Sequence, residues 1–116
     1  MTPTARDNFV LPEVVRRYQD AHDHHATETA LSAFTGDAIV TDEDRTYRGS
    51  DQIRRWLDSA ATEFTYTRTF VSAEQTSPTT WIVVNHLEGD FPGGHVDLRY
   101  RFTLTGGRIS ALAITP

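Results

Sequence analysis

The stretch Asp37–Leu57, with the sequence DAIVTDEDRTYRGSDQIRRWL, decides the fold of the chain. Its apolar segment Ala38–Thr41 has the composition of a short β-strand. Asp42 closes that strand, and Tyr47 begins a return strand after a polar turn. Ser50 is a suitable N-cap for a helix that follows. The stretch therefore predicts a strand ending in a carboxylate, a tight turn and an amphipathic helix.

Two further helices are expected before this stretch. Apolar residues recur at three- and four-residue steps from Leu11 to about His25, which is the period of one helical face. A second, short helix is expected over Thr27–Phe34, with Gly36 as its stop. Residues Met1 to Asn8 are polar and predict a loose arm. The polar side chains of the first helix are expected mainly on its solvent side: Arg16, Arg17, Gln19, Asp20 and Asp23.

From Glu63 onward the apolar period changes to two, which is typical of β-strands. Ser77-Pro78, the glycine-rich segment 89–94 and Gly106-Gly107 indicate the turns between these strands. Helices thus come first and hairpin-linked strands follow. This order predicts an α+β fold with three N-terminal helices packed in the concave face of a curved antiparallel sheet, a cone-shaped α+β barrel. The 116 residues suit a single domain over 1–116.

Alternation within the predicted strands selects the side chains that face the helices. In the strand Thr79–Glu88, Asn85 shares the inner face with apolar neighbours and His86 faces outward. A one-residue bulge would exchange these two positions, so both are candidates for the interior. In the strand His95–Thr105, Tyr100 lies on the apolar face.

Composition excludes several classes of function. The chain has no cysteine, which removes disulfides, thiolate nucleophiles and zinc-thiolate sites. The net charge of −5 and the pI near 5.4 disfavour nucleic acid as a partner. No apolar run approaches the roughly 20 residues needed to span a membrane. The N-terminus lacks the organisation of a signal peptide, so we expect a cytoplasmic protein.

Three motifs carry a resemblance to a known family. The patterns D-A-x-V-x-D over 37–42, Y-x-G over 47–49 and I-x-x-W over 53–56 resemble the signature of the nuclear transport factor 2-like superfamily. The segment DLRYRFTL over 97–104, followed by GRI over 107–109, is similar to its SnoaL-like branch. The likeness extends from about Leu11 to Pro116. It implies ketosteroid isomerases, polyketide cyclases, dehydratases, epoxide hydrolases and non-catalytic binding proteins as relatives, so it does not fix function.

The resemblance to ketosteroid isomerase implies a catalytic pair. VVRRY over 14–18 and the later Asp42 have the separation of that family's oxyanion tyrosine and proton-shuttling aspartate. Asp42 would take a proton next to a carbonyl, and Tyr18 would hydrogen-bond the enolate oxygen. The family's second oxyanion donor corresponds here to Leu98, and a supporting tyrosine corresponds to Leu57. Half of the isomerase oxyanion arrangement is therefore missing.

Each candidate residue also has a purely structural interpretation. Asp42 could be a turn carboxylate that binds backbone N–H groups. Tyr18 and Trp56 could be plain core residues, although Trp56 is also a candidate for lining a pocket. Asn85 would be a polar handle in such a pocket, since a buried asparagine needs hydrogen-bond partners. His86 is its alternate and Tyr100 is a further substrate-binding candidate; as an acid or base, histidine suits such a role.

Two clusters of charged residues could bind a ligand, a metal ion in one case and an anion in the other, but each has a simpler structural interpretation. The run Asp20–His25 contains three histidines and two aspartates, yet no second motif supplies the remaining ligands of a metal site. We interpret it as a helix-end cluster in which histidines complement the helix dipole. Arg99 and Arg101 could clamp an anion, but strand alternation turns them outward, toward solvent or an interface.

The sequence predicts a domain with an apolar cavity for a hydrophobic small molecule. It would perform cofactor-free isomerisation, cyclisation or dehydration, with neither a metal nor an organic cofactor. The alternatives are a non-catalytic binding domain, which the leucines at 57 and 98 favour, and a dimerisation module with a filled core. We also predict a homodimer through the outer face of the sheet.

Overall fold

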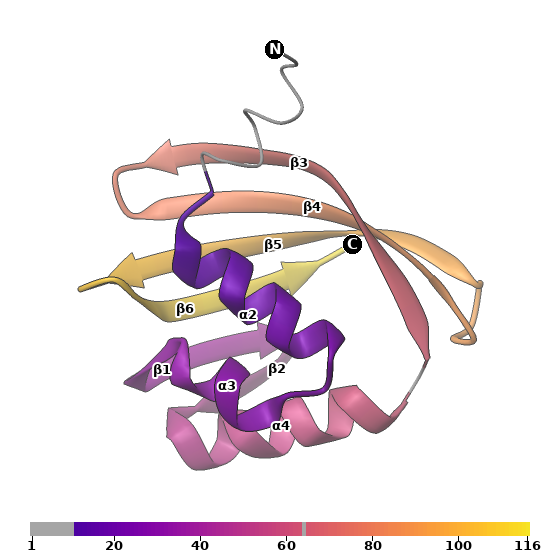
Figure 1. Cartoon of the computed structure of the whole chain (residues 1–116), viewed down its shortest axis with the longest axis horizontal. Coiled ribbons are helices and arrows are strands. Elements are labelled where there is room, and N and C mark those ends of the chain that lie inside the picture. Colours follow the sequence, from indigo (N-terminus) through magenta and orange to yellow (C-terminus); the bar gives the residue numbers. More distant parts are fainter. Residues whose placement is uncertain (1–10, 64) are drawn as a thin grey trace.

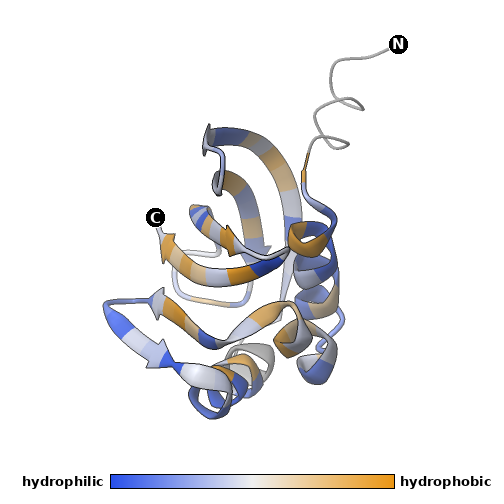
Figure 2. Cartoon of the chain, turned by 90° about the vertical axis from the view of Figure 1, so that its left-hand side faces the viewer, coloured by the Kyte–Doolittle hydropathy of each residue, from blue (hydrophilic) through white to orange (hydrophobic). Residues whose placement is uncertain are grey.

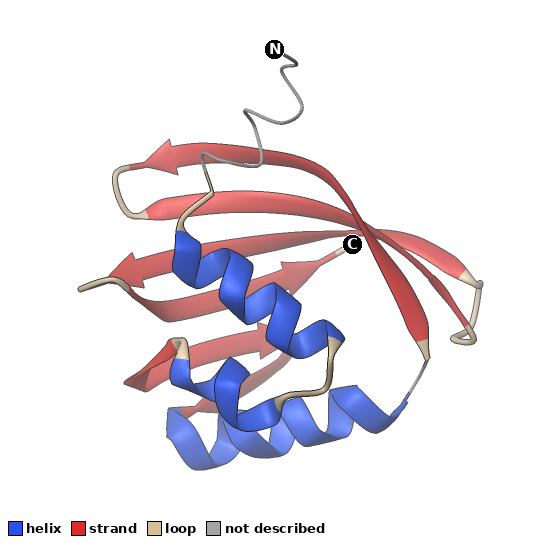
Figure 3. Cartoon of the chain, viewed as in Figure 1, coloured by secondary structure: helices blue, strands red, loops and turns tan. Residues whose placement is uncertain are grey.

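The computed structural model describes residues 11–63 and 65–116, so the arm predicted for Met1–Asn8 lies outside the described residues. Three helices lie on one side of a single sheet (Figure 3). They are α2 (Glu13–Asp23), α3 (Thr27–Ser32) and α4 (Gly49–Glu63). No helix of the described residues is long and apolar enough to cross a membrane.

Six strands form one sheet in the order β2-β1-β6-β5-β4-β3. The sheet curves around the helices without closing, and α2 crosses in front of it (Figure 1). This arrangement confirms the predicted α+β cone. The strands are β1 (Phe34–Asp42), β2 (Arg45–Arg48), β3 (Tyr66–Ser77), β4 (Thr80–Gly89), β5 (His95–Thr105) and β6 (Arg108–Thr115).

One pair in the sheet departs from the antiparallel prediction. β1 and β6 run parallel, with Val40 opposite Leu112 and Asp42 opposite Ile114. Every other pair is antiparallel and joins strands that follow one another along the chain. The parallel pair closes the gap between the N-terminal hairpin and the four C-terminal strands, and it brings the end of β1 next to the last strand.

The first strand begins earlier than expected. The helix predicted over Thr27–Phe34 ends at Ser32, and Phe34 already pairs with Ile109 of β6. The Ile109 N–H donates to the carbonyl of Ala33 at 2.8 Å, which fixes the chain in an extended path. Gly36 is therefore a strand residue and not the stop of a helix. Pairing with β6, which no local pattern records, outweighs the helical tendency of this segment.

The core lies between the helices and the inner face of the sheet. Hydrophilic and hydrophobic residues alternate along the strands (Figure 2). In β4 this alternation buries Trp81, Val83, Asn85 and Leu87 in turn. The helices contribute Val15, Tyr18, Ile53, Trp56 and Leu57 from the other side.

The turn after Asp42 is strained. Glu43 and Asp44 have φ angles of 52° and 64° and form the two-residue loop between β1 and β2. The matching loop between β5 and β6 uses Gly106 and Gly107 at φ 59° and 82°. Glycine adopts such angles without the steric cost that a side chain adds.

Replacing Glu43-Asp44 with Asn-Gly is expected to raise the free energy of unfolding by about 1 kcal/mol, because it relieves part of the left-handed strain. Urea denaturation of the variant measures the change. Gly107→Ala in the matching loop is the control, and it should destabilise the chain. A decrease in stability of the Asn-Gly variant would show that Glu43 or Asp44 makes compensating contacts.

Candidate functional site

Asp42 ends β1 with its side chain turned toward α4. The indole Nε1 of Trp56 donates a hydrogen bond to its Oδ2 at 3.1 Å. Trp56 is itself buried, and its ring lies 6.1 Å from that of Tyr47. The indole thus orients one carboxylate oxygen, and Trp56 has a positioning role besides its place in the core. Asp42 itself is only partly buried.

Tyr18 lies in the middle of α2 with only 2% of its surface exposed. Its ring makes edge contacts with Phe34 and Phe102, at centroid distances of 5.3 and 5.8 Å. Burial raises the pKa of its phenol well above the ordinary value, and the neighbouring Tyr100, Tyr66 and Asp42 raise it further. The phenol therefore keeps its proton at neutral pH and can act as a hydrogen-bond donor.

His22 lies one helical turn after Tyr18. The sequence pattern grouped it with the charged helix-end cluster Asp20–His25, whereas the structure places it among aromatic side chains. Its ring lies 6.0 Å from Tyr18, 6.3 Å from Trp56 and 6.4 Å from Tyr66. Its Nδ1 is 3.1 Å from the Tyr66 hydroxyl. Burial, followed by the charge of Asp23, raises the pKa of Tyr66 to about 12. Since this phenol stays protonated, we assign it as the donor and Nδ1 as the acceptor.

These side chains, with Tyr100 from β5, form what we call the interior cluster. Burial raises the pKa of Tyr100 most, the charges of Tyr66, Asp42 and Asp23 add to the rise, and Arg68 opposes it. The ring of His22 contacts those of Tyr18, Trp56 and Tyr66, and Phe102 lies between Tyr18 and Tyr100, so the groups share one region between α2, α4 and the sheet. The members of the interior cluster are Tyr18, His22, Asp42, Trp56, Tyr66 and Tyr100.

Burial lowers the pKa of His22; Asp23 opposes this, and the charges of His25 and Arg68 add to it. Below its ordinary pKa of 6.5, the unfolded chain therefore binds a proton here that the folded chain resists. Stability linked to His22 is full above that pH and is lost as the pH falls below it.

Wild-type chain is thus expected to lose more unfolding free energy between about pH 7.5 and about pH 5.5 than a His22→Gln variant does. Urea denaturation at each pH measures the difference. His86→Gln is a control in which the pH dependence of stability should change in the opposite direction. Hydrogen bonds to Asp97 and then Glu88 raise the pKa of His86, so the stability linked to it is lost as the pH rises. Equal losses in wild type and His22→Gln would contradict the assignment.

Arg68 of β3 connects the end of α2 to the sheet. Its Nη2 lies 2.7 Å from Asp23 Oδ2 and 3.8 Å from Asp20 Oδ1. Its Nη1 donates to Gln19 Oε1 at 3.0 Å and to Asn85 Oδ1 at 3.3 Å. We call Arg68 with these four partners the Arg68 network.

Two amide groups of this network are left half-satisfied. Gln19 and Asn85 are 4% and 0% exposed, and their amide nitrogens have no hydrogen-bond partner among the described residues. A buried donor without a partner costs about 1–3 kcal/mol. The burial of Gln19 corrects its predicted place on the solvent side of α2. It lies four residues after Val15, which puts both on the same helical face.

His86 lies outside the interior cluster. Strand β4 keeps the simple alternation, so Asn85 points inward and His86 outward. On the outer face its Nδ1 is 2.6 Å from Asp97 and its Nε2 is 3.2 Å from Glu88. The structure thus joins Asn85 to the interior through Arg68, whereas it joins His86 to a surface cluster of acidic residues. Arg99 and Arg101 are exposed on β5.

The histidines at the end of α2 separate into two roles. The ring of His24 is 2.7 Å from the carbonyl oxygen of Asp20 through Nδ1, which is the helix-end contact expected of this segment. His22 instead belongs to the interior cluster. Among residues 11–63 and 65–116, no three histidine, cysteine, aspartate or glutamate side chains are grouped to hold a metal ion.

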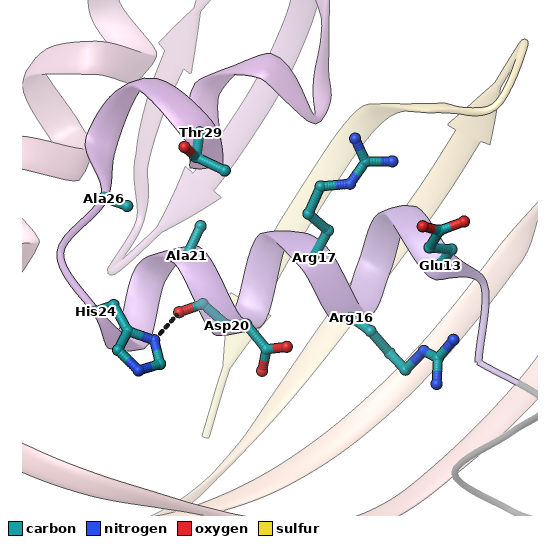
Figure 4. Close-up of a pocket in the computed structure, with 8 residues that line it drawn as sticks. All are labelled: Glu13, Arg16, Arg17, Asp20, Ala21, His24, Ala26 and Thr29. Carbon is teal, nitrogen blue, oxygen red and sulfur yellow. Dashed lines mark hydrogen bonds between the residues drawn. The ribbon is translucent and has the colours of Figure 1, made fainter.

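A cavity of about 480 Å³ lies on the outer side of α2 and α3, and no member of the interior cluster lines it (Figure 4). Its lining is charged and largely exposed, and Arg16 and Arg17 leave α2 in different directions. The acidic and basic groups around it do not converge on one point. We therefore build the candidate site on the interior cluster, whose members are buried or partly buried and contact one another. The lining residues are Glu13, Arg16, Arg17, Asp20, Ala21, His24, Ala26 and Thr29.

Several residues of the interior cluster and the Arg68 network were not named as site candidates from the sequence, although most of them stand in patterns that could have indicated them. Tyr66 and Arg68 alternate on the apolar face of their strand, where a charged side chain needs a buried partner. His22 follows Tyr18 by four residues, so the two share a helical face. Gln19 carried the weakest signal, because a polar residue on a helix is ordinarily exposed.

Comparison with solved structures identifies the fold family. A provisionally assigned polyketide cyclase of Sinorhizobium meliloti is 32% identical over 90% of this chain and 95% of its own, with a TM-score of 0.85. The chain belongs to the nuclear transport factor 2-like superfamily, in its SnoaL-like branch. No protein-family model and no curated protein matches it.

Two more distant structures share the fold of this SnoaL-like domain. A ketosteroid isomerase-like protein of Catenulispora acidiphila, solved with trimethylamine, is 17% identical over 92% of this chain and 87% of its own, with a TM-score of 0.81. A Mycobacterium tuberculosis protein in complex with estradiol-17β-hemisuccinate is 14% identical over 89% and 90%, with a TM-score of 0.74. Small molecules thus bind to other proteins of this fold.

Proposed function

We propose that this SnoaL-like domain binds an apolar carbonyl compound and moves a proton on it without a cofactor. Asp42 is the base and Tyr18 the hydrogen-bond donor to the carbonyl oxygen. The observation that carries the proposal is the Asp42 carboxylate, anchored at the end of β1 by Trp56 Nε1. His22 connects this part of the site to the buried Tyr18, because its ring lies 6.3 Å from that of Trp56 and 6.0 Å from that of Tyr18.

The chemistry follows from these two groups. Asp42 takes a proton from the carbon next to the carbonyl, and the C–H electron pair moves onto the carbonyl oxygen to give an enolate. Tyr18 donates a hydrogen bond to that oxygen as its charge develops. In an isomerisation, Asp42 then returns the proton to the far end of the conjugated system, so no atom is gained or lost.

The remaining residues would shape the site around the substrate. Trp56 and Tyr100 offer aromatic surface, and Asn85 offers a polar contact deep in the interior. His86 would take part only if the strand moved, so it is the weakest of the four binding candidates. The Mycobacterium tuberculosis protein binds estradiol-17β-hemisuccinate, a steroid half-ester with a free carboxylate, which supports a ligand with a steroid-like apolar body here.

The second candidate function is ligand binding without catalysis. Leu57 is buried and Leu98 is partly buried where the resemblance to ketosteroid isomerase calls for polar groups. Two leucines cannot stabilise an enolate, so the oxyanion would depend on Tyr18 and on Tyr66 or Tyr100. This observation favours slow catalysis or none.

Paired binding and turnover measurements test the proposal. Wild-type protein is incubated with a β,γ-unsaturated cyclic ketone, and the conjugated product is followed by ultraviolet absorbance. Estradiol binding is measured in parallel by calorimetry. A rate above that of buffer supports proton transfer. Estradiol binding without turnover supports the non-catalytic alternative, and the failure of both assays favours a pocketless dimerisation module.

The homodimer and the cytoplasmic location stay predictions. The face of the sheet opposite the helices includes Val71, which is 53% exposed, and the partly buried Ile82 and Val84. An apolar surface of this kind suits a second copy of the chain. Sedimentation equilibrium would measure the mass of the particle.

A further inference from the structure

Two buried amides share one guanidinium nitrogen, and this fixes how they point. Arg68 Nη1 donates to the oxygens of both Gln19 and Asn85. Because an arginine has no acceptor, each amide must present its oxygen to the guanidinium. The two NH₂ groups therefore point away from Arg68, and neither finds a partner among the described residues.

Two buried NH₂ groups of this kind need a hydrogen-bond acceptor, and the described residues do not supply one. Buried polar groups in folded proteins are nearly always hydrogen-bonded, so an unpaired pair in one network is unusual. Leucine has the branched shape of asparagine without a polar donor, so an apolar side chain at these positions would leave no buried N–H unpaired. The chain nevertheless has amides at both positions, one from α2 and one from β4.

The charge of the network selects the kind of acceptor. Arg68 is neutralised by Asp23 at 2.7 Å, and Asp20 adds a second carboxylate at 3.8 Å. Asp42 contributes a further carboxylate to the same interior. No positive charge is left over for a carboxylate or phosphate ligand, whose burial here would be opposed by like charge. A neutral oxygen meets no such opposition.

The donors also lie on the elements that carry the proposed site. Gln19 is buried on α2, as Tyr18 is, and Arg68 lies two residues after Tyr66 on β3. A ligand in the interior could therefore place one oxygen at Tyr18 and another at the two amides.

We propose that Gln19 and Asn85, oriented by Arg68, form a subsite for a second, neutral acceptor oxygen of the ligand, such as that of a ketone or ester. The inference rests on the proposed function, because it takes the interior as the ligand site. It narrows the substrate class to uncharged apolar molecules with an oxygen function at each end, and it disfavours carboxylic acids.

Three naphthalene probes of one shape test the subsite: 2-acetylnaphthalene, 2-ethylnaphthalene and 2-naphthoate. Calorimetry on the full chain should show the ketone binding about tenfold more tightly than the hydrocarbon, with the carboxylate weaker than the ketone. In ¹⁵N-edited NMR spectra, the ketone should shift the side-chain NH₂ signals of Gln19 and Asn85. Signals of the exposed Gln75 side chain should stay in place.

Variants separate the amides from the rest of the site. Asn85→Leu combined with Gln19→Leu should reduce the preference for the ketone to less than about twofold while keeping the affinity for the hydrocarbon. Gln75→Leu is the matched control and should keep the full preference. If the double variant does not fold, the NMR shifts of the Gln19 and Asn85 side-chain NH₂ groups still decide, because they separate the amides from the Tyr18 donor.

Several outcomes would overturn the subsite. One such outcome is that wild-type protein binds none of the probes, or binds the ketone and the hydrocarbon equally. The acceptor for the two NH₂ groups would then be a buried water and not a ligand oxygen. A carboxylate that binds most tightly would overturn the neutral assignment. The Asp42→Asn protein distinguishes this proposal from the catalytic one: it should keep the preference for the ketone whether or not Asp42 proves to be the base.

Discussion

The Asp42→Asn variant is expected to isomerise a β,γ-unsaturated ketone about 10²- to 10⁴-fold more slowly than wild type, the range that a general base contributes. Asparagine keeps an oxygen that can accept the hydrogen bond from Trp56 Nε1, so the geometry at the end of β1 should survive. It loses the negative charge and the ability to take a proton. Initial rates at saturating ketone measure kcat directly.

Two companion variants show whether the loss is chemical. Tyr18→Phe removes the proposed enolate donor and should lower kcat by about 10- to 1000-fold, at the lower end where another tyrosine substitutes for it. Asp97→Asn changes a carboxylate on the outer face, next to His86, and should leave kcat unchanged. Unchanged turnover in Asp42→Asn would remove Asp42 as the base, and equal losses in Asp97→Asn would indicate a general effect of charge.

The sequence predicted the elements that local patterns determine. The alternation of β4 was sufficient to place Asn85 inside, because period two fixes which side chains share a face. It could not predict the parallel pairing of β1 with β6. Those strands are joined by neither a hairpin nor a short crossover, and the rules for turns connect only successive strands.

The family resemblance named Asp42 and Tyr18 as candidates, but no pattern in the sequence indicated which side chains contact them. Asp42 and Tyr18 came from a family resemblance, and the structure adds the indole that orients the carboxylate. His22 was grouped with its neighbours in sequence, whereas α2 turns it toward Tyr66. Gln19 was assigned to solvent because of its polarity. Its burial depends on Arg68, which lies 49 residues away along the chain, and no pattern within one helix records such a partner.

The Arg68 network leads to the largest expected effect on stability. Arg68→Met is expected to lower the free energy of unfolding by about 2–4 kcal/mol, because it leaves a carboxylate and two amide oxygens without their donor. Methionine keeps the apolar stem of the side chain, so the loss reports the charge and its hydrogen bonds. This loss is smaller than that for breaking a fully buried ion pair, because 28% of the Asp23 side chain is exposed to solvent. For a domain of this size the midpoint of thermal unfolding should fall by roughly 10–20 °C.

A second arginine provides the matched control. Arg54 on α4 makes a comparable two-point contact with Glu28, at 2.9 and 3.1 Å, but both side chains are exposed. Arg54→Met should therefore change the melting temperature little, since water replaces the lost partner. The double variant Arg68→Met, Asp23→Asn should be less destabilised than the sum of its single variants, because removing one charge relieves the other. If Arg68→Met melted close to wild type, Gln19 and Asn85 would have to find other donors, and their amide nitrogens would no longer be fixed in the direction that the proposed ligand subsite requires.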